Sequence, residues 1–241
     1  MSDTRLCIQY AEIFPSTLIA LSAEDRKYLF KVLRYSAGDT LSVIDGKGKI
    51  YRARVIDKKT LEILYEERHY QEDIFSIFLC QGLLKGERME MVIQKATEIG
   101  VKKIIPFVSE RCIIKHTRKI ERWKKIAKEA TEQSGSITVP EINEMVNFSD
   151  LIKQAENGIL FWENSEASLM QAVLELTPDR PIFLFIGPEG GFSPEEIQLA
   201  EKRGMKIASL GKRILRAETA SIVSLALVNF LLQVKIEKIK L

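Results

Sequence analysis

The spacing of apolar residues changes near Phe75, and this change constrains the fold more than any other feature of the sequence. From residue 75 onwards, short apolar runs alternate with segments whose apolar residues recur every three or four positions. The runs are "FSIFLC", "KKIIPF", "GILFW", "IFLFI" and "KIASL", and a helical pattern follows each of them. Strands that alternate with helices predict a largely parallel α/β sheet with helices on both faces.

The chain before residue 70 has a different pattern, which predicts mostly strands. The stretch "TLSVIDGKGKIYRARVIDKKTLEILYEE" contains turn residues at 45–46 and 57–59 between partly alternating segments. One helix interrupts them, with Ser22 as its cap and with Leu29, Val32 and Leu33 on its apolar face. We therefore expect a small β-barrel-like domain over 1–72 and an α/β domain over 73–241, joined by the polar residues 69–73.

Composition excludes several classes of protein. The apolar fraction of 46% and charged fraction of 29% are those of a globular chain, and a net charge of +3 does not by itself indicate a nucleic-acid partner. Three widely spaced cysteines and two histidines predict neither a disulfide framework nor a zinc site. The start of the chain lacks a signal-peptide pattern, and the uncharged stretch 219–234 is shorter than a membrane span. We expect a cytoplasmic protein without a metal or a membrane anchor.

A glycine-rich loop follows the fourth expected strand of the second domain, in "IFLFIGPEGGFSPEE". A phosphate-binding P-loop would place a lysine after its last glycine, whereas Phe192 follows Gly191 here. Ser193 and Glu196 form a predicted capping box, so acidic groups occupy the positive end of the next helix. Dinucleotide-binding domains and common methyltransferases carry their glycine turn after the first strand. The sequence therefore disfavours a polyphosphate or a dinucleotide ligand.

Two more strand ends carry residues suited to a ligand site. The segment "KIASLGKRILRAETA" ends its strand at Gly211, and "GILFWENS" ends its strand at Glu163. Because ligands bind beyond the carboxyl ends of parallel strands, the three ends are expected to meet at one pocket. The alternative is that the glycines only relieve backbone strain in tight turns.

The paired motifs "IGPEGGFSPEE" and "LGKRILRAETA" resemble the signature of the 16S ribosomal RNA uridine-N3 methyltransferases, the RsmE family of the SPOUT superfamily. Supporting matches are "VLRYSAGD" (32–39), "KGERMEMVIQKATEIGV" (85–101), "PFVSER" (106–111) and "EQSG" with "VP" (132–140). The resemblance covers most of the chain. It implies a PUA-like β-barrel, a SPOUT-type parallel sheet with a C-terminal trefoil knot, and a homodimer. It further implies S-adenosylmethionine as cofactor and 16S rRNA in the 30S subunit as substrate.

The cofactor residues follow from the two motifs and the neighbouring strand. Backbone groups at glycine-rich strand ends can bind adenine, and apolar side chains can flank it, although some of these can equally be core. The candidate residues are Leu160, Glu163, Ile186, Gly187, Pro188, Gly190, Gly191, Leu210, Gly211, Ile214, Leu215 and Arg216.

Methylation of uracil at N3 requires loss of a proton, and the resulting negative charge spreads onto the ring oxygens. Arg216 is the candidate to stabilise that charge, and the alternative is a structural ion pair with Glu218 or Glu189. Glu189 or Glu218 is the candidate base, unless these carboxylates only accept backbone hydrogen bonds.

RNA binding has support from local clusters of basic residues. Lys27, Lys31 and Arg34 have the spacing of one helical face, and eight Lys or Arg lie between 111 and 128 against one acid. The candidate RNA contacts are Lys27, Lys31, Arg34, Lys85, Arg88, Arg111 and Lys115. The second cluster can equally be a solvated face, and Trp123 within it is assigned to the core rather than to base stacking.

The last helix, "ASIVSLALVNFLLQV", is apolar almost all round and must be buried inside its domain or across a dimer. The rival to the enzyme hypothesis is a non-catalytic RNA-binding or ribosome-assembly protein that retains the fold.

Overall fold

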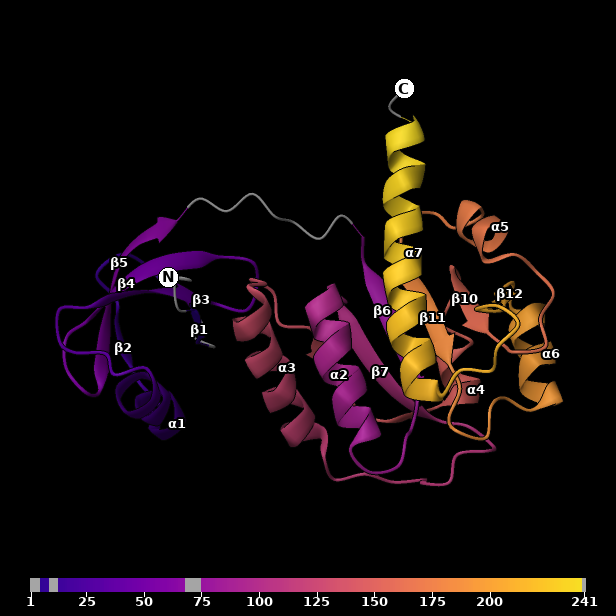
Figure 1. Ribbon diagram of the computed structural model, residues 1–241, viewed down its shortest axis with the longest axis horizontal. Coiled ribbons are helices and arrows are strands. Elements are labelled where there is room, and N and C mark those ends of the chain that lie inside the picture. The colour runs from indigo at the N-terminus through magenta and orange to yellow at the C-terminus, as the bar shows by residue number, and fades with distance from the viewer. Residues whose placement is uncertain (1–4, 9–12, 68–74, 240–241) are drawn as a thin grey trace. The chain divides into compact units, whose positions relative to one another are not determined.

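The computed structural model describes residues 5–8, 13–67 and 75–239, and the chain forms two compact units (Figure 1). Unit 1 comprises Met1–Glu72 together with Lys128–Val139, and unit 2 comprises Asp73–Ala127 together with Pro140–Leu241. The expected polar join at 69–73 lies outside the described residues. The inclusion of 128–139 in unit 1 was not predicted, because the sequence pattern of that segment is simply the end of a helix.

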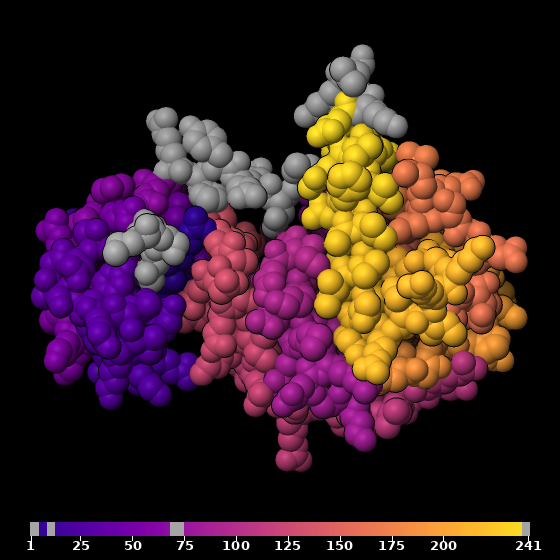
Figure 2. Space-filling model, viewed as in Figure 1, coloured from indigo at the N-terminus to yellow at the C-terminus, as the bar shows by residue number. Residues whose placement is uncertain are grey.

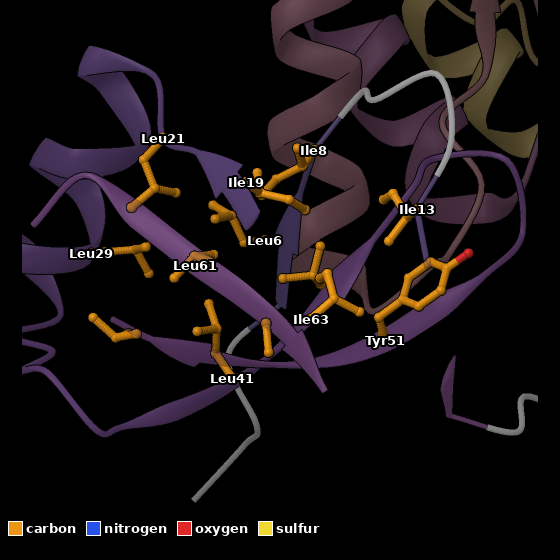
Figure 3. Packing of buried hydrophobic residues seen from close by; sticks show 13 residues of the cluster. Leu6, Ile8, Ile13, Ile19, Leu21, Leu29, Leu41, Tyr51, Leu61 and Ile63 are labelled. Atoms are coloured by element: carbon orange, nitrogen blue, oxygen red, sulfur yellow. The ribbon is translucent and has the colours of Figure 1, made fainter. Parts of the chain in front are cut away.

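Unit 1 is a five-stranded sheet whose strands curve around an apolar core (Figure 3). The strands are β1 (Arg5–Cys7), β2 (Leu18–Ala20), β3 (Thr40–Ile44), β4 (Ile50–Val55) and β5 (Thr60–Glu67). Their order is β1-β3-β4-β5-β2, with β1 parallel to β3 and the other pairs antiparallel. Both predicted turns are confirmed: Asp45 accepts the N–H groups of Lys47 and Lys49, and Asp57 accepts that of Lys59.

The predicted first helix exists, but its second half is wider than an α-helix. Ser22 caps α1 (Ala23–Arg26) by accepting the N–H of Asp25, and the chain continues as the π-helix η1 (Lys27–Val32). In a π-helix the backbone bonds span five residues, so the α-helical spacing is lost. Leu29 is buried as predicted, but Val32 is 61% exposed. Arg34 lies beyond the helix end with φ of 62°, so the predicted α-helical face through Lys27, Lys31 and Arg34 is wrong.

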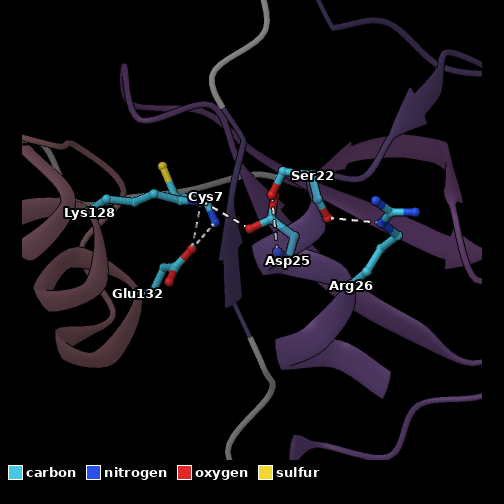
Figure 4. A network of polar contacts seen from close by, with 6 residues as sticks. All are labelled: Cys7, Ser22, Asp25, Arg26, Lys128 and Glu132. Carbon is cyan, nitrogen blue, oxygen red and sulfur yellow. Dashed lines mark hydrogen bonds and ion pairs between the residues drawn. The ribbon is translucent and has the colours of Figure 1, made fainter. Parts of the chain in front are cut away.

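Residues 128–139 are held in unit 1 by polar and apolar contacts (Figure 4). The N–H of Cys7 donates to Glu132 Oε1 at 2.7 Å, and Lys128 Nζ lies 3.1 Å from Asp25 Oδ1. Ile137 belongs to a small apolar cluster with Cys7, Ile44 and Ile50. The end of a helix and the residues that follow it, from later in the chain, therefore add polar and apolar contacts to the N-terminal unit.

Unit 2 is a seven-stranded parallel sheet, which confirms the predicted architecture. Its strands are β6 (Ile77–Gly82), β7 (Lys103–Val108), β8 (Glu141–Ile142), β9 (Val146–Asn147), β10 (Gly158–Phe161), β11 (Ile182–Ile186) and β12 (Lys206–Ala208). The order is β12-β10-β11-β6-β7-β8, and β9 also pairs with β7. Strands β8 and β9 were not predicted, because two residues are too few to form an apolar run. The glycine loop therefore follows the sixth strand of the unit, not the fourth.

A helix follows each of the five predicted apolar runs, and one short helix, at 148–151, was not predicted. The helices are α2 (Arg88–Ile99), α3 (Ile120–Ser134), α4 (Phe148–Leu151), α5 (Leu169–Leu174), α6 (Pro194–Lys202) and α7 (Ala217–Ile239). Helix α2 buries Met89, Val92, Ile93 and Ala96 and ends at Gly100, which has the left-handed conformation. Trp123 of α3 is buried, so its assignment to the core is confirmed.

Helix α7 packs against α2, α5, β6 and β11 and lies along the surface of unit 2, yellow in Figure 2. It buries Leu225, Val228 and Leu232, whereas Leu227 and Phe230 are 40% and 60% exposed. By length and composition it is also the one helix among the described residues that could cross a membrane, a test that core helices pass as well. Only part of its apolar surface is therefore covered within one chain.

Candidate functional site

A pocket lies beyond the carboxyl ends of three adjacent parallel strands. Strands β12, β10 and β11 are neighbours in the sheet, and the loops that follow them line a cavity of about 480 Å³. The lining residues are Arg88, Phe161, Trp162, Glu163, Ile186–Phe192, Leu210, Gly211, Arg213–Glu218 and Ala220. The three strand ends that the sequence singled out thus meet at one site.

The glycine loop adopts a conformation that side chains would obstruct. A Cβ on Gly190 would lie 2.9 Å from the backbone oxygen of Arg111, and Gly191 has φ of 69°. Phe192 then turns into the core, with its ring 6.1 Å from that of Phe107 in a stacked arrangement. The glycines are therefore required by backbone proximity, and they leave backbone groups at the wall of the pocket.

The start of α6 uses its acidic residues internally. Ser193 and Glu196 form the predicted capping box, and the second carboxylate oxygen of Glu196 accepts the N–H of Glu110 at 2.9 Å. These bonds satisfy N–H groups that a phosphate would otherwise bind. The geometry agrees with a ligand other than a polyphosphate.

A basic side chain between two carboxylates forms one wall of the pocket. Arg88 Nη1 lies 3.3 Å from Glu189 Oε1, and Arg88 Nε lies 3.9 Å from Glu218 Oε1. Glu189 Oε1 also accepts the backbone N–H of Lys85 at 3.0 Å. The other carboxylate oxygen of each glutamate is buried and has no hydrogen-bond partner among the described residues. Each glutamate therefore retains an acceptor that the protein itself does not satisfy.

Arg216 lines the pocket and is exposed. The sequence left open whether it pairs with Glu189 or Glu218. In the described part of the chain, the ion pairs of both carboxylates are made by Arg88. Arg216 therefore lines the pocket without an ion pair to Glu189 or Glu218 in the part of the chain that the structure describes.

All but one of the predicted cofactor residues line this pocket. The exception is Leu160, which is 0% exposed in the core of unit 2 because alternate residues of β10 point to opposite faces of the sheet. Six further residues line the pocket but were not predicted from the sequence: Phe161, Trp162, Phe192, Arg213, Ala217 and Ala220. Arg88 also lines it, although the sequence predicted Arg88 as an RNA contact. The aromatic pair 161–162 precedes Glu163 directly, which was the available signal.

Two side chains that were predicted to contact RNA form hydrogen bonds within unit 2. Lys115 Nζ donates to the backbone oxygens of Ser109 and Glu110 at 2.6 and 2.8 Å. Arg111 donates to the backbone oxygen of Gly190 at 3.4 Å. Later in the same basic cluster, Lys119 and Arg122 both pair with Glu90. Much of this cluster therefore stabilises the fold of the chain. Among the described residues, no group of three His, Cys, Asp or Glu could hold a metal ion.

Comparison with known proteins gives a consistent result over almost the whole chain. Residues 71–229 match the model of an RNA methyltransferase domain, and residues 21–64 match that of an RNA methyltransferase PUA domain. The ribosomal RNA small subunit methyltransferase E of Synechocystis is 33% identical over 95% of this chain and 78% of its own length. The protein of that name from Buchnera aphidicola (Acyrthosiphon pisum) is 36% identical, with 85% of each chain covered.

A solved structure agrees with these relatives in fold. The crystal structure of a ribosomal RNA small subunit methyltransferase E from Neisseria gonorrhoeae, bound to S-adenosyl methionine, superposes with a TM-score of 0.86. The two sequences are 31% identical, and the match covers 95% of this chain and 98% of that chain. Fold, motifs and matched length agree, and the chain belongs to the ribosomal RNA small subunit methyltransferase E family.

Proposed function

We propose that this chain transfers the methyl group of S-adenosylmethionine to N3 of a uridine in 16S rRNA of the small ribosomal subunit. The observation that carries the proposal is the pocket at the ends of β10, β11 and β12. The glycines that line it leave backbone N–H and C=O groups accessible to a ligand. Membership of the family supplies the reaction class and the RNA substrate. The choice of N3 of uridine rests on the resemblance of the paired motifs.

The residues of the pocket fit S-adenosylmethionine. Backbone groups of Gly187, Gly190 and Gly211 would hold the adenine, with Ile186 and Leu210 as apolar neighbours. When bound, this cofactor supplies an electrophilic methyl group on a sulfonium. The unpartnered oxygens of Glu189 and Glu218 suit a ligand with cationic or N–H groups better than a phosphate.

The chain's own side chains can serve the proton transfer and the charge that follows it. Glu189 or Glu218 would accept the proton from uracil N3 on its free oxygen. The guanidinium of Arg216 would then stabilise the negative charge that spreads onto the ring oxygens of uracil. Arg88 would keep the two carboxylates apart and oriented. Most of the remaining rate enhancement would come from holding the reactants in line.

Unit 1 and its PUA match support a role as the RNA-binding domain, with 1–72 as that domain and 73–241 as the methyltransferase domain. Lys27, Lys31 and Arg34 stay the proposed contacts there, on η1 and the residues that follow it. In unit 2 the proposed contacts are Lys85, Arg88, Arg111 and Lys115. Arg88 lines the pocket, and Lys85 and Arg111 donate hydrogen bonds to Glu189 and Gly190 of the glycine loop.

A homodimer in the cytoplasm is the proposed assembly and location. The exposed apolar residues Leu227 and Phe230 of α7 and Ile214, which is 83% exposed, support burial against a second copy.

The test of the proposed function is incubation with labelled S-adenosylmethionine and 30S particles that lack the modification, followed by mapping of the methylated base. A single label at uridine N3 of 16S rRNA is the expected result. Label elsewhere would correct the target, and no label would favour the non-catalytic assembly protein. Calorimetry separates the latter case further, because such a protein would give no binding heat at millimolar S-adenosylmethionine.

A further inference from the structure

A buried amide lies directly behind the pocket. Gln81 is the penultimate residue of β6 and is 0% exposed. In the sheet it pairs with Ile186, the last residue before the glycine loop. A polar side chain in such a place is unfavourable unless it is hydrogen-bonded, so the bonds of Gln81 show what it connects.

The amide of Gln81 bonds to three other groups. Its Nε2 donates to the backbone oxygen of Gly82 at 3.0 Å and lies 3.5 Å from that of Gly187. Its Oε1 accepts the hydroxyl of Ser221, whose oxygen also lies 2.8 Å from the backbone oxygen of Ala217 within α7. The two carbonyl oxygens at one end require the NH₂ group there, so the other end must be the oxygen and Ser221 must be the donor. The orientation of the amide is thereby fixed by its surroundings.

These bonds join β6 to the start of the glycine loop and to α7, which follows another of the three loops that line the pocket. Gly187 opens the glycine loop, and Ser221 lies in the first turns of α7, directly after the loop that contains Gly211 and Arg216. The end of β6 also approaches the glycine loop very closely, since a Cβ on Gly82 would lie 2.5 Å from the nitrogen of Pro188. A change at Gln81 would therefore be transmitted to two walls of the pocket.

We propose that Gln81 is a positioning residue for binding of the methyl donor and that it acts through Gly187 and Ser221. Gln81 does not itself line the pocket. Its bonds hold the two loops in one relative arrangement before the ligand arrives, so that less ordering is needed on binding. The inference rests on the proposed function, because it concerns the same pocket.

Substitution of two serines of α7 distinguishes a positioning role of Gln81 from a general effect on stability. Ser221 and Ser224 are both 0% exposed. Only Ser221 reaches Gln81, whereas the hydroxyl of Ser224 donates to the backbone oxygen of Ser221 at 3.0 Å, within the helix. Ser221→Ala and Ser224→Ala thus remove one buried hydroxyl each, and only the first breaks the link to β6.

The experiment is calorimetric titration of the full chain with S-adenosylmethionine, together with thermal unfolding of each variant. Loss of a buried hydrogen-bond network predicts that Gln81→Met and Ser221→Ala raise Kd about 10- to 100-fold. The Kd of Ser224→Ala should stay within about 3-fold of that of the parent chain, although its change in Tm should be comparable to that of Ser221→Ala. The double variant Gln81→Met with Ser221→Ala should bind no more weakly than Gln81→Met, because the two side chains act through one bond.

Equal affinities of the two serine variants would overturn the proposal, as would normal affinity of Gln81→Met. If Gln81→Met does not fold, the serine pair alone decides. Failure of the proposed function is seen separately, because the unmodified chain would then bind no S-adenosylmethionine.

Discussion

At the scale of single residues, two arginines line the pocket in different surroundings, and we propose different roles for them. Arg88 is paired with Glu189 and Glu218, whereas Arg216 lines the pocket without an ion pair to either carboxylate among the described residues. An arginine held by carboxylates orients the site, and one that faces the ligand can respond to charge that develops there.

Arg216→Ala is expected to keep binding of S-adenosylmethionine but to lower turnover about 10²- to 10³-fold, the loss typical of one electrostatic stabiliser. Single-turnover methylation of 30S particles measures the rate, and calorimetry measures the binding. Lys212→Ala is the control, since Lys212 is exposed on the same loop and does not line the pocket. A near-normal rate for Arg216→Ala would remove this residue from the mechanism.

Cys7 should make unit 1 less stable at alkaline pH. Burial raises the pKa of the Cys7 thiol from 9.0 to about 12. The folded state therefore retains a proton that the unfolded state loses, and stability falls as pH rises from about 9 towards 12, by up to about 1.4 kcal/mol per pH unit.

Urea unfolding between pH 8 and pH 10 measures this slope. Cys7→Ala keeps the backbone bond to Glu132 and should flatten the slope of unit 1. Cys80 in unit 2 is buried and its thiol pKa is also raised, so the slope of unit 2 should remain. An unchanged slope for unit 1 in Cys7→Ala would contradict the assignment.

At the scale of elements, the end of α3 is the part of the fold that joins distant segments of the chain. Glu132 accepts the N–H of Cys7 on β1, although 125 residues separate them. Burial raises the pKa of Glu132, so a carboxylate at this position has a desolvation cost. The bond to β1 is a reason for a carboxylate at this position.

Glu132→Ala leaves a buried N–H on β1 without its partner and is expected to destabilise unit 1 by about 1–3 kcal/mol. Chemical unfolding followed by a probe in unit 1 would measure the difference. Glu129→Ala is the matched control, because Glu129 is exposed on the same helix. Equal effects of the two substitutions would show that the bond to β1 contributes nothing specific.

At the scale of the whole molecule, we propose two sets of exposed residues as contacts for partners. One is the apolar face of α7, and the other comprises Lys27, Lys31 and Arg34 of unit 1.

Phe230→Glu is expected to shift the chain from dimer to monomer, because a charge would be buried in an apolar interface. Sedimentation over a range of concentrations measures the equilibrium. Ile56→Glu, on an exposed turn of unit 1, should leave it unchanged. A chain that sediments as a monomer before substitution would reject the homodimer.

Simultaneous charge reversal of Lys27, Lys31 and Arg34 should weaken binding to 16S rRNA and reduce the slope of log K against log[salt], by about one unit for each lost phosphate contact. Filter binding at several salt concentrations measures both quantities. Reversal of Lys153 and Arg180 of unit 2 is the control, since both are exposed and pair with exposed acids. Unchanged binding by the triple variant would place the RNA elsewhere.

The sequence by itself determined the features that depend on neighbours along the chain. The strand and helix periodicity after Phe75, the turns at Asp45 and Asp57, and the capping box at Ser193 all follow from local geometry. The glycine motif also identified the pocket, because parallel strands bring their carboxyl ends to one edge.

Only the tertiary structure decided which distant groups meet. It paired Arg88 with Glu189 and Glu218, placed residues 128–139 in unit 1, and turned Leu160 into the core. It also widened the first helix, which removed Arg34 from the predicted face. The physical reason is that charge pairing, burial and helix widening depend on packing between segments that lie more than one hundred residues apart in the chain, and no local pattern encodes that packing.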